Sequence, residues 1–265
     1  AEREAERYRR RQAEHGNRHA RGFPDPLFTR VDADETIQQF KPVAYGHATE
    51  VLPGVTLIFR DAGHILGSAS VWLQLEEEGI RSRIVFSGDV GQYDSPILRD
   101  PEGNGAADMV VMESTYGNRR HRERSDTLRE FGEILRAARA GGGNVLIPAF
   151  AVGRSQEVLY ELASHFDEWR VGDWQVFLDS PMAIEASEIY WKHPELYDAE
   201  ASAARRDAGR MPALPSLKLC RSAEESMAIN LLRGGAIIIA GSGMCSGGRI
   251  VHHLKHNITQ RECDV

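Results

Sequence analysis

The pattern of hydrophobic and polar positions divides the chain into a strand-rich first part and an alternating second part. Within the first 115 residues, Val55–His64 reads as a strand running into a loop. Residues 69–87 read as a hairpin that turns near Glu78 and Gly79, because apolar and polar residues alternate there. The segment Asp108–Thr115 is nearly continuously apolar, which predicts a short strand buried on both faces.

The following 150 residues alternate between strand and helix patterns, as in a parallel α/β sheet. A short helix is also expected over Asp32–Gln39, with Asp32 as its N-cap, and a charged helix or linker over residues 1–20. Residues 199–216 read as irregular. The expected helices of the second part are 125–140, 153–166, 184–193, 222–232 and 248–258, and its strands lie within 141–150, 175–183 and 235–244.

Composition narrows the class of protein. The chain has 265 residues, 42% of them hydrophobic, and no apolar run long enough to predict a membrane span. Its three cysteines lack paired CxxC spacing, which argues against a disulfide framework and for a reduced, cytoplasmic setting. The net charge of −7 argues against a uniformly basic nucleic-acid coat, although a local basic groove stays compatible with it.

Two glycine-rich loops carry side chains that can bind a metal ion. His64 lies in "DAGHILGS" and Asp89 lies in "FSGDVG", each directly after a predicted strand, on successive strands of one sheet. Imidazole nitrogen and carboxylate oxygen are both zinc ligands. Each residue alone also fits a structural role, as an incidental histidine or as a turn aspartate bonding its own backbone.

Three further motifs follow predicted strands. Glu113 in "MESTYGN" ends an apolar strand, so it needs a partner, either as a support for a metal ligand or as a cap. Arg154 in "PAFAVGRSQEVL" opens a helix, which favours a phosphate. The loop "AGSGMCSGGR", with Ser242, Ser246 and Arg249, repeats that arrangement. Such loops also arise from simple packing of a helix on a sheet.

The helix expected near the C-terminus carries His252, His253 and His256. His252 and His256 share one helix face, but no acidic residue lies between them as in HExxH. A position on the helix surface near a phosphate-binding loop is therefore favoured over a metal site.

As an ordered set, "DAGHILGSA", "FSGDVG…PILRDP", "MESTYGNRRHR", "PAFAVGRSQEVL", "FLDSPMA" and "GSGMCSGGRIVHHLKHNI" resemble the β-CASP branch of the metallo-β-lactamase superfamily. The branch contains ribonucleases such as RNase J and the cleavage and polyadenylation endonuclease. The resemblance implies an α/β fold with a partial metallo-β-lactamase αββα sandwich over residues 1–120. A β-CASP domain with a mainly parallel sheet flanked by helices, incomplete at its C-terminal end, would follow over residues 121–265.

The resemblance also implies roles for individual residues. His64 looks like a zinc ligand, Asp89 like the aspartate that bridges two zinc ions, and Glu113 like the acidic residue that supports the site. Arg154 and the loop with Ser242, Ser246 and Arg249 fall where the family lines its RNA groove. The implied cofactor is zinc, and the implied partner is single-stranded RNA, with no membrane partner. A homodimer stays open, because the sequence gives no oligomeric state.

The departures from the family pattern decide what this chain is expected to do. The family's HxHxDH signature and two later histidines of the family pattern are absent from this sequence. We therefore expect an internal fragment of a two-zinc ribonuclease, holding little zinc and inactive as this chain alone. The alternatives are a β-CASP scaffold subunit that binds RNA without catalysis, and another metallo-β-lactamase-fold hydrolase acting on a small molecule.

Overall fold

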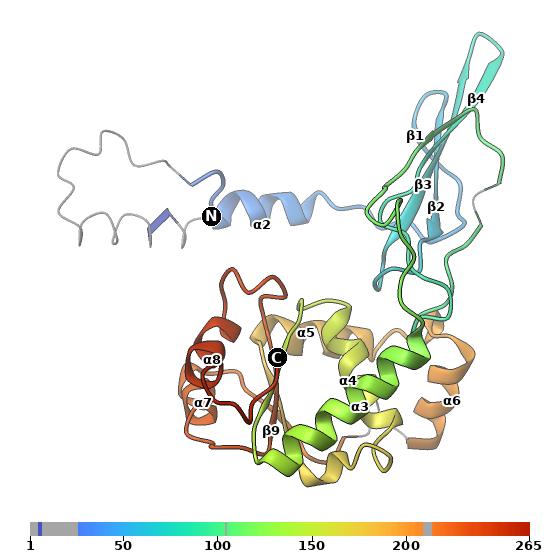
Figure 1. Ribbon diagram of the computed structural model, residues 1–265. Coiled ribbons are helices and arrows are strands. Elements are labelled where there is room, and N and C mark those ends of the chain that lie inside the picture. The colour runs from blue at the N-terminus through green and yellow to red at the C-terminus, as the bar shows by residue number, and fades with distance from the viewer. Residues whose placement is uncertain (1–4, 7–25, 104, 209–213) are drawn as a thin grey trace. The chain divides into compact units, whose positions relative to one another are not determined.

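The computed structural model describes residues 5–6, 26–103, 105–208 and 214–265 (Figure 1). The chain separates into two compact units, Ala1–Ala44 and Tyr45–Val265. The expectation for residues 1–20 falls almost entirely outside the described residues. Within the described part, no helix is both long and apolar enough to cross a membrane.

The helices and strands are these, in chain order: α2 (Arg30–Gln38), β1 (Thr49–Leu52), β2 (Val55–Asp61), β3 (Ala69–Glu77), β4 (Ile80–Phe86), β5 (Met109–Val111), α3 (Arg124–Gly141), β6 (Val145–Pro148), α4 (Arg154–Ser164), η1 (Val171–Asp173), β7 (Gln175–Asp179), α5 (Pro181–Tyr190), η2 (Pro194–Leu196), α6 (Ala199–Ala208), β8 (Leu217–Leu219), α7 (Ala223–Ile229), β9 (Ala236–Ala240) and α8 (Ile250–Asn257).

Helix α2 lies in the first unit and begins earlier than the sequence predicted. Its N-cap is Thr29 and not Asp32. The Thr29 hydroxyl accepts a hydrogen bond from the Asp32 amide, and the Asp32 carboxylate accepts one from the Thr29 amide, which makes a reciprocal capping box. Asp32 therefore does act at this helix start, but from its third position.

The five-stranded sheet of the second unit has the order β1-β2-β3-β4-β5. Strands β1 to β4 pair antiparallel, and β5 joins β4 in parallel. The predicted hairpin is confirmed: Glu77 pairs with Ile80, and both turn residues, Glu78 and Gly79, have positive φ. Strands β2 and β4, which precede the His64 and Asp89 loops, are not successive as expected, because β3 lies between them.

The prediction that the strand around 108–115 is buried on both faces is wrong. All three residues of β5 are exposed. The strand lies at the edge of the sheet, and a continuous apolar run in a sequence does not distinguish an edge strand from a central one.

The four-stranded sheet has the order β6-β9-β7-β8, and every neighbouring pair in it is parallel. Strand β9 is fully buried, and its alternate residues pack into two different hydrophobic cores on the two faces of the sheet. Ile237 and Ile239 pack in the main core with side chains of α3, α4 and α5. Ile238 packs with Ile229 of α7. Helices therefore cover both faces of the sheet (Figure 1), and the predicted α/β fold class is confirmed.

Residues 199–216 are not irregular throughout as expected, because α6 occupies their first half. Asp198 caps it by accepting a hydrogen bond from the Ala201 amide at 2.6 Å. The short strands β1 and β8 were not predicted from the sequence. Cys220, Cys245 and Cys263 are free.

Candidate functional site

The loops after β2 and β4 lie directly on each other at one end of the five-stranded sheet. The Gly91 amide donates a hydrogen bond to the Ala62 carbonyl at 2.8 Å. A Cβ atom on Gly91 would lie 1.9 Å from the Gly63 carbonyl oxygen and 2.8 Å from the His64 nitrogen. Only glycine permits this approach. The structure therefore brings the loop with Asp89 against the loop with His64.

The backbone around His64 is fixed by hydrogen bonds within its own loop. The amides of His64 and Ile65 donate to the Ser68 hydroxyl at 3.1 and 3.2 Å. The Gly63 amide donates to the Asp61 carboxylate at 2.9 Å. The loop holds its shape while the His64 side chain is exposed. Asp89 is likewise exposed, in the facing loop.

Glu113 joins the same end of the sheet from the loop after β5. Its carboxylate accepts a hydrogen bond from the Val90 amide at 2.8 Å, and its own amide donates to the Ser87 hydroxyl at 3.1 Å. The hydrogen bond from Val90 lowers the pKa of Glu113 most, followed by that from Thr115, and His64 adds a smaller electrostatic contribution in the same direction. Glu113 is therefore an ionised anchor for the loop that carries Asp89.

The donor chemistry of this cluster fits zinc, but the number of donors falls short. His64 and Asp89 offer one nitrogen and one carboxylate, whereas zinc in proteins takes about four ligands. Among the described residues, no group of three or more His, Cys, Asp and Glu side chains is arranged to hold a metal ion. These residues alone do not complete a zinc centre.

The remaining predicted residues lie at the carboxyl edge of the four-stranded sheet. Arg154 begins α4 after β6, and its side chain is 66% exposed and paired with Glu157 at 2.7 Å. Ser242 follows β9 and donates from its hydroxyl to the Gly247 carbonyl at 3.2 Å. Ser246 is exposed in the same loop.

Arg249 is held inside the fold by three acceptors. Its guanidinium donates to the Asp179 carboxylate at 2.7 Å and to the carbonyls of Cys220 and Arg221, each at 2.9 Å. Its predicted role in binding RNA stays a prediction. The structure adds a second role, in which Arg249 joins α8 to the end of β7 and to the loop after β8.

Asp179 is the centre of a buried network that sequence reasoning missed. Besides Arg249, it contacts His253 at 2.6 Å and accepts a hydrogen bond from Ser226 at 2.6 Å. Burial raises its pKa, but these three partners outweigh burial and leave the pKa below its ordinary value. The available signal was an acid directly after the apolar run "QVFL", the same signal that pointed to Glu113.

His253 is fully buried, which corrects the expectation of a helix-surface position, while His252 and His256 are exposed. Its second ring nitrogen contacts the Asn230 side chain at 2.9 Å. His253 therefore connects α8 with α7 and β7.

The two groups of loops touch each other. A Cβ atom on Gly153 would lie 2.8 Å from Cγ2 of Ile65, the neighbour of His64. The Leu66 amide donates to the Tyr190 hydroxyl at 2.9 Å. The His64 loop therefore lies against the start of α4 and the end of α5.

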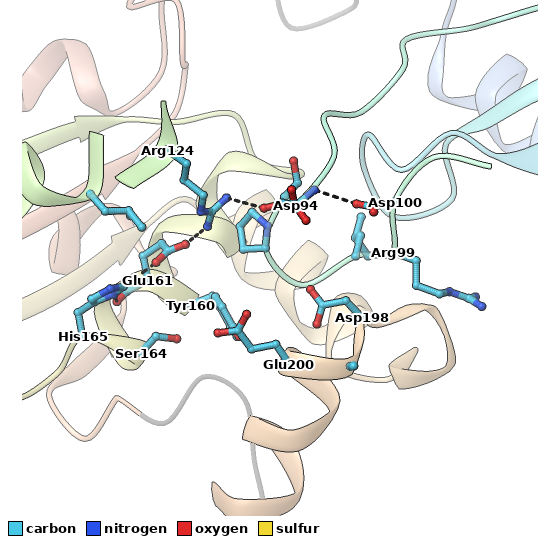
Figure 2. Close-up of a pocket in the computed structure, with 15 residues that line it drawn as sticks. Asp94, Arg99, Asp100, Arg124, Tyr160, Glu161, Ser164, His165, Asp198 and Glu200 are labelled. Atoms are coloured by element: carbon cyan, nitrogen blue, oxygen red, sulfur yellow. Dashed lines mark hydrogen bonds and ion pairs between the residues drawn. The ribbon is translucent and has the colours of Figure 1, made fainter. Parts of the chain in front are cut away.

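A cavity of about 580 Å³ lies apart from these residues. It is lined by the loop Asp94–Asp100 and by parts of α3, α4 and α6, and none of the predicted site residues lines it. Figure 2 shows Arg124 in the middle of it, paired with Glu161 and donating to the Asp94 carbonyl. Burial raises the pKa of Glu161 despite Arg124 and His165 nearby. Arg124 and Glu161, two charged residues of the cavity lining, are therefore already paired with each other.

Comparison with known proteins gives a match to the Beta-Casp domain over residues 155–265. The chain is 40% identical over 238 residues to Ribonuclease TTHA0252 of Thermus thermophilus, covering 89% of this chain and 53% of that protein. It is 34% identical to Transcription termination factor FttA of Pyrococcus abyssi, covering 87% of this chain and 36% of that protein. It is 26% identical to an RNase J-like protein of Methanocaldococcus jannaschii, covering 86% of this chain and 52% of that protein. The chain thus spans about half or less of the length of these relatives.

Proposed function

We propose that this chain, whose residues 155–265 match the Beta-Casp domain, forms part of a zinc-dependent ribonuclease of the β-CASP family that hydrolyses phosphodiester bonds in single-stranded RNA. The relatives named as ribonucleases and as a transcription termination factor support RNA as the substrate. The domain boundary at residue 120 stays a prediction.

One observation carries the proposal. The loops with His64, Asp89 and Glu113 pack together at one end of a sheet, and the same end touches the Gly153 turn next to Arg154. A metal-dependent site that cuts a phosphodiester needs metal-binding groups and phosphate-binding groups at one place, and this contact joins the two predicted sets.

In this proposal, His64 and Asp89 are two ligands of a two-zinc centre whose other ligands come from outside the described residues. Zinc at such a site supplies a Lewis acid and a water of lowered pKa. Glu113 holds the Asp89 loop through the Val90 amide. Arg154, with Ser242, Ser246 and Arg249, contributes to binding the RNA backbone.

The test is to measure zinc content, binding of a labelled single-stranded RNA and its cleavage, for this chain and for the protein as encoded at full length. We expect the chain alone to hold little zinc and not to cleave RNA. We expect the full-length protein to hold zinc and to cleave RNA. A full-length protein that binds RNA without metal or cleavage would instead be a scaffold subunit. One that holds zinc but neither binds nor cuts RNA would be a hydrolase of small molecules.

A further inference from the structure

Three exposed apolar side chains lie in the segments that directly follow neighbouring strands of the four-stranded sheet. Phe150 follows β6, Met244 follows β9 and Met182 follows β7, and these strands are adjacent in the order β6-β9-β7. Their exposed fractions are 55%, 74% and 68%. Because parallel strands end at the same edge, the three residues belong to one surface, which we call the Phe150 platform.

Contacts between the loops confirm that this edge is continuous. A Cβ atom on Gly241 would lie 3.7 Å from the Ala149 carbonyl oxygen and 3.8 Å from the Ser180 hydroxyl. The turns after β6, β9 and β7 therefore meet at Gly241. Exposed apolar side chains that gather in this way mark a binding surface more often than isolated ones do.

Phe150 is held in place while much of its ring stays open to solvent. A Cβ atom on Gly243 would lie 3.0 and 3.1 Å from Cδ2 and Cε2 of the ring, so glycine lets the loop pack closely against the ring. The Phe150 carbonyl accepts a hydrogen bond from the Ser155 hydroxyl at 2.7 Å. A fixed, half-exposed aromatic ring is prepared to stack a planar group at little cost in side-chain entropy.

The surroundings of the Phe150 platform fit a nucleic-acid strand. Arg154, four residues after Phe150, is exposed and can meet a phosphate while the ring meets a base. Gly153 between them packs on Ile65, next to His64. A base placed on Phe150 would therefore belong to a nucleotide close to the proposed hydrolytic site.

We infer that the Phe150 platform is a base-stacking subsite for single-stranded RNA, in which a nucleobase stacks on Phe150 and Met182 and Met244 make adaptable contacts at its sides. The inference rests on the proposed function and adds to it a determinant that recognises bases instead of phosphates. Such a subsite tolerates any base, since each base has a π-face.

The test compares binding of two fluorescent probes to the 265-residue chain, decauridylate and an abasic ribose-phosphate decamer. We expect the chain to prefer decauridylate. Phe150→Ala should weaken decauridylate binding about fivefold or more and leave abasic binding unchanged. Phe150→Tyr should restore the preference, whereas Phe150→Leu, which keeps an apolar side chain without the π-face, should not.

Leu231→Ala is the matched control, because Leu231 is 82% exposed in the turn after α7, which leads to the opposite edge of the sheet. Circular dichroism of each variant reports whether it folds. Equal decauridylate affinity for Phe150→Ala and the parent chain would overturn the subsite while leaving the proposed function intact. Failure of the parent chain to bind decauridylate at low salt would also overturn the subsite, whereas the proposed function is tested separately by cleavage with the full-length protein.

Discussion

Asp179 and Glu113 are both carboxylates that follow apolar runs, yet different partners keep them ionised. Asp179 has no exposed surface and depends on Arg249, His253 and Ser226. Glu113 lies in a surface loop and depends mainly on the Val90 amide. The first carboxylate joins elements of the fold, whereas the second fixes the loop that carries a proposed metal ligand.

Asp179→Ala should lower the free energy of unfolding by about 3 kcal/mol or more, because it leaves buried donors without their acceptor. Urea denaturation measures this change. The control is Asp126→Ala, which removes an exposed pair with Arg129 and should cost less than about 1 kcal/mol. Similar losses in the two variants would contradict the importance assigned to the buried network.

The stability difference between the parent chain and Asp179→Ala should depend on pH. Since the folded-state pKa of Asp179 lies below its ordinary value of 3.8, its contribution to stability is complete above that pH and is lost as the pH falls through the folded-state pKa. The difference in unfolding free energy between the parent chain and Asp179→Ala should therefore shrink below pH 3.8. A difference that stays constant there would rule out this carboxylate as its source.

Arg154→Ala should weaken RNA binding and lower the salt slope by about one, without changing stability, because the Arg154 side chain is exposed. Arg170→Ala is a matched control. Both arginines are exposed and pair with a carboxylate three residues on, but Arg170 precedes β7 and so lies at the opposite edge of the sheet. Equal effects of the two changes on the salt slope would show only a general loss of charge.

Arg249→Ala is a less specific test of RNA binding. We predict weaker binding with a smaller salt slope for it too, but Arg249 also bonds Asp179 and two carbonyls. Its loss should therefore reduce stability as well, and the two effects need separate measurements.

Helices and strands with a strong pattern were predictable, whereas those defined by their neighbours were not. The buried strands β6, β7 and β9 and the helices α3, α4, α7 and α8 match the expected segments closely. Helix α6 was missed because its apolar residues are all alanines, which give no clear core-facing pattern, and because its cap, Asp198, lies in a stretch that looked irregular. The exposed position of β5 depends on which strand pairs beside it, which local sequence does not contain.

The candidate site divides in the same way. The sequence predicted the loops of His64, Asp89 and Glu113, because glycines and strand ends mark them. It did not predict the Asp179–His253 contact, since 74 residues separate the two side chains and only the packing of α8 joins them.

The exposed position of strand β5 predicts that the 265-residue chain self-associates through this strand. Its exposed apolar residues form one of the two edges of the five-stranded sheet among the described residues, so a second chain can pair along it. Val110→Lys should reduce the aggregated fraction of the 265-residue chain, as measured by light scattering. Leu231→Lys adds the same charge away from this edge and should have little effect. Equal reduction by both would point to net charge and not to the edge.

Across the second unit, the proposed function depends on loops that belong to different sheets. The loops of His64, Asp89 and Glu113 end one sheet, and those of Phe150, Arg154 and Ser242 end the other. The contact between Gly153 and Ile65 and the hydrogen bond from Leu66 to Tyr190 join them. In this proposal, each set alone lacks part of what metal-dependent phosphodiester hydrolysis requires, namely metal ligands or groups that bind the RNA strand.

In the proposed function, Asp89 connects these features to catalysis as a metal ligand. In the full-length protein, cleavage and binding of a 5′-labelled single-stranded RNA should be compared between the parent and Asp89→Ala, with Asp126→Ala as the control. We expect the cleavage rate of Asp89→Ala to fall by about 100-fold or more, while its RNA affinity stays within about twofold of the parent. Loss of a residue that only supports a metal ligand lowers activity by about 10- to 100-fold, and loss of the ligand itself should cost more. Cleavage by Asp89→Ala at the parent rate would contradict the assignment of this loop to the metal site.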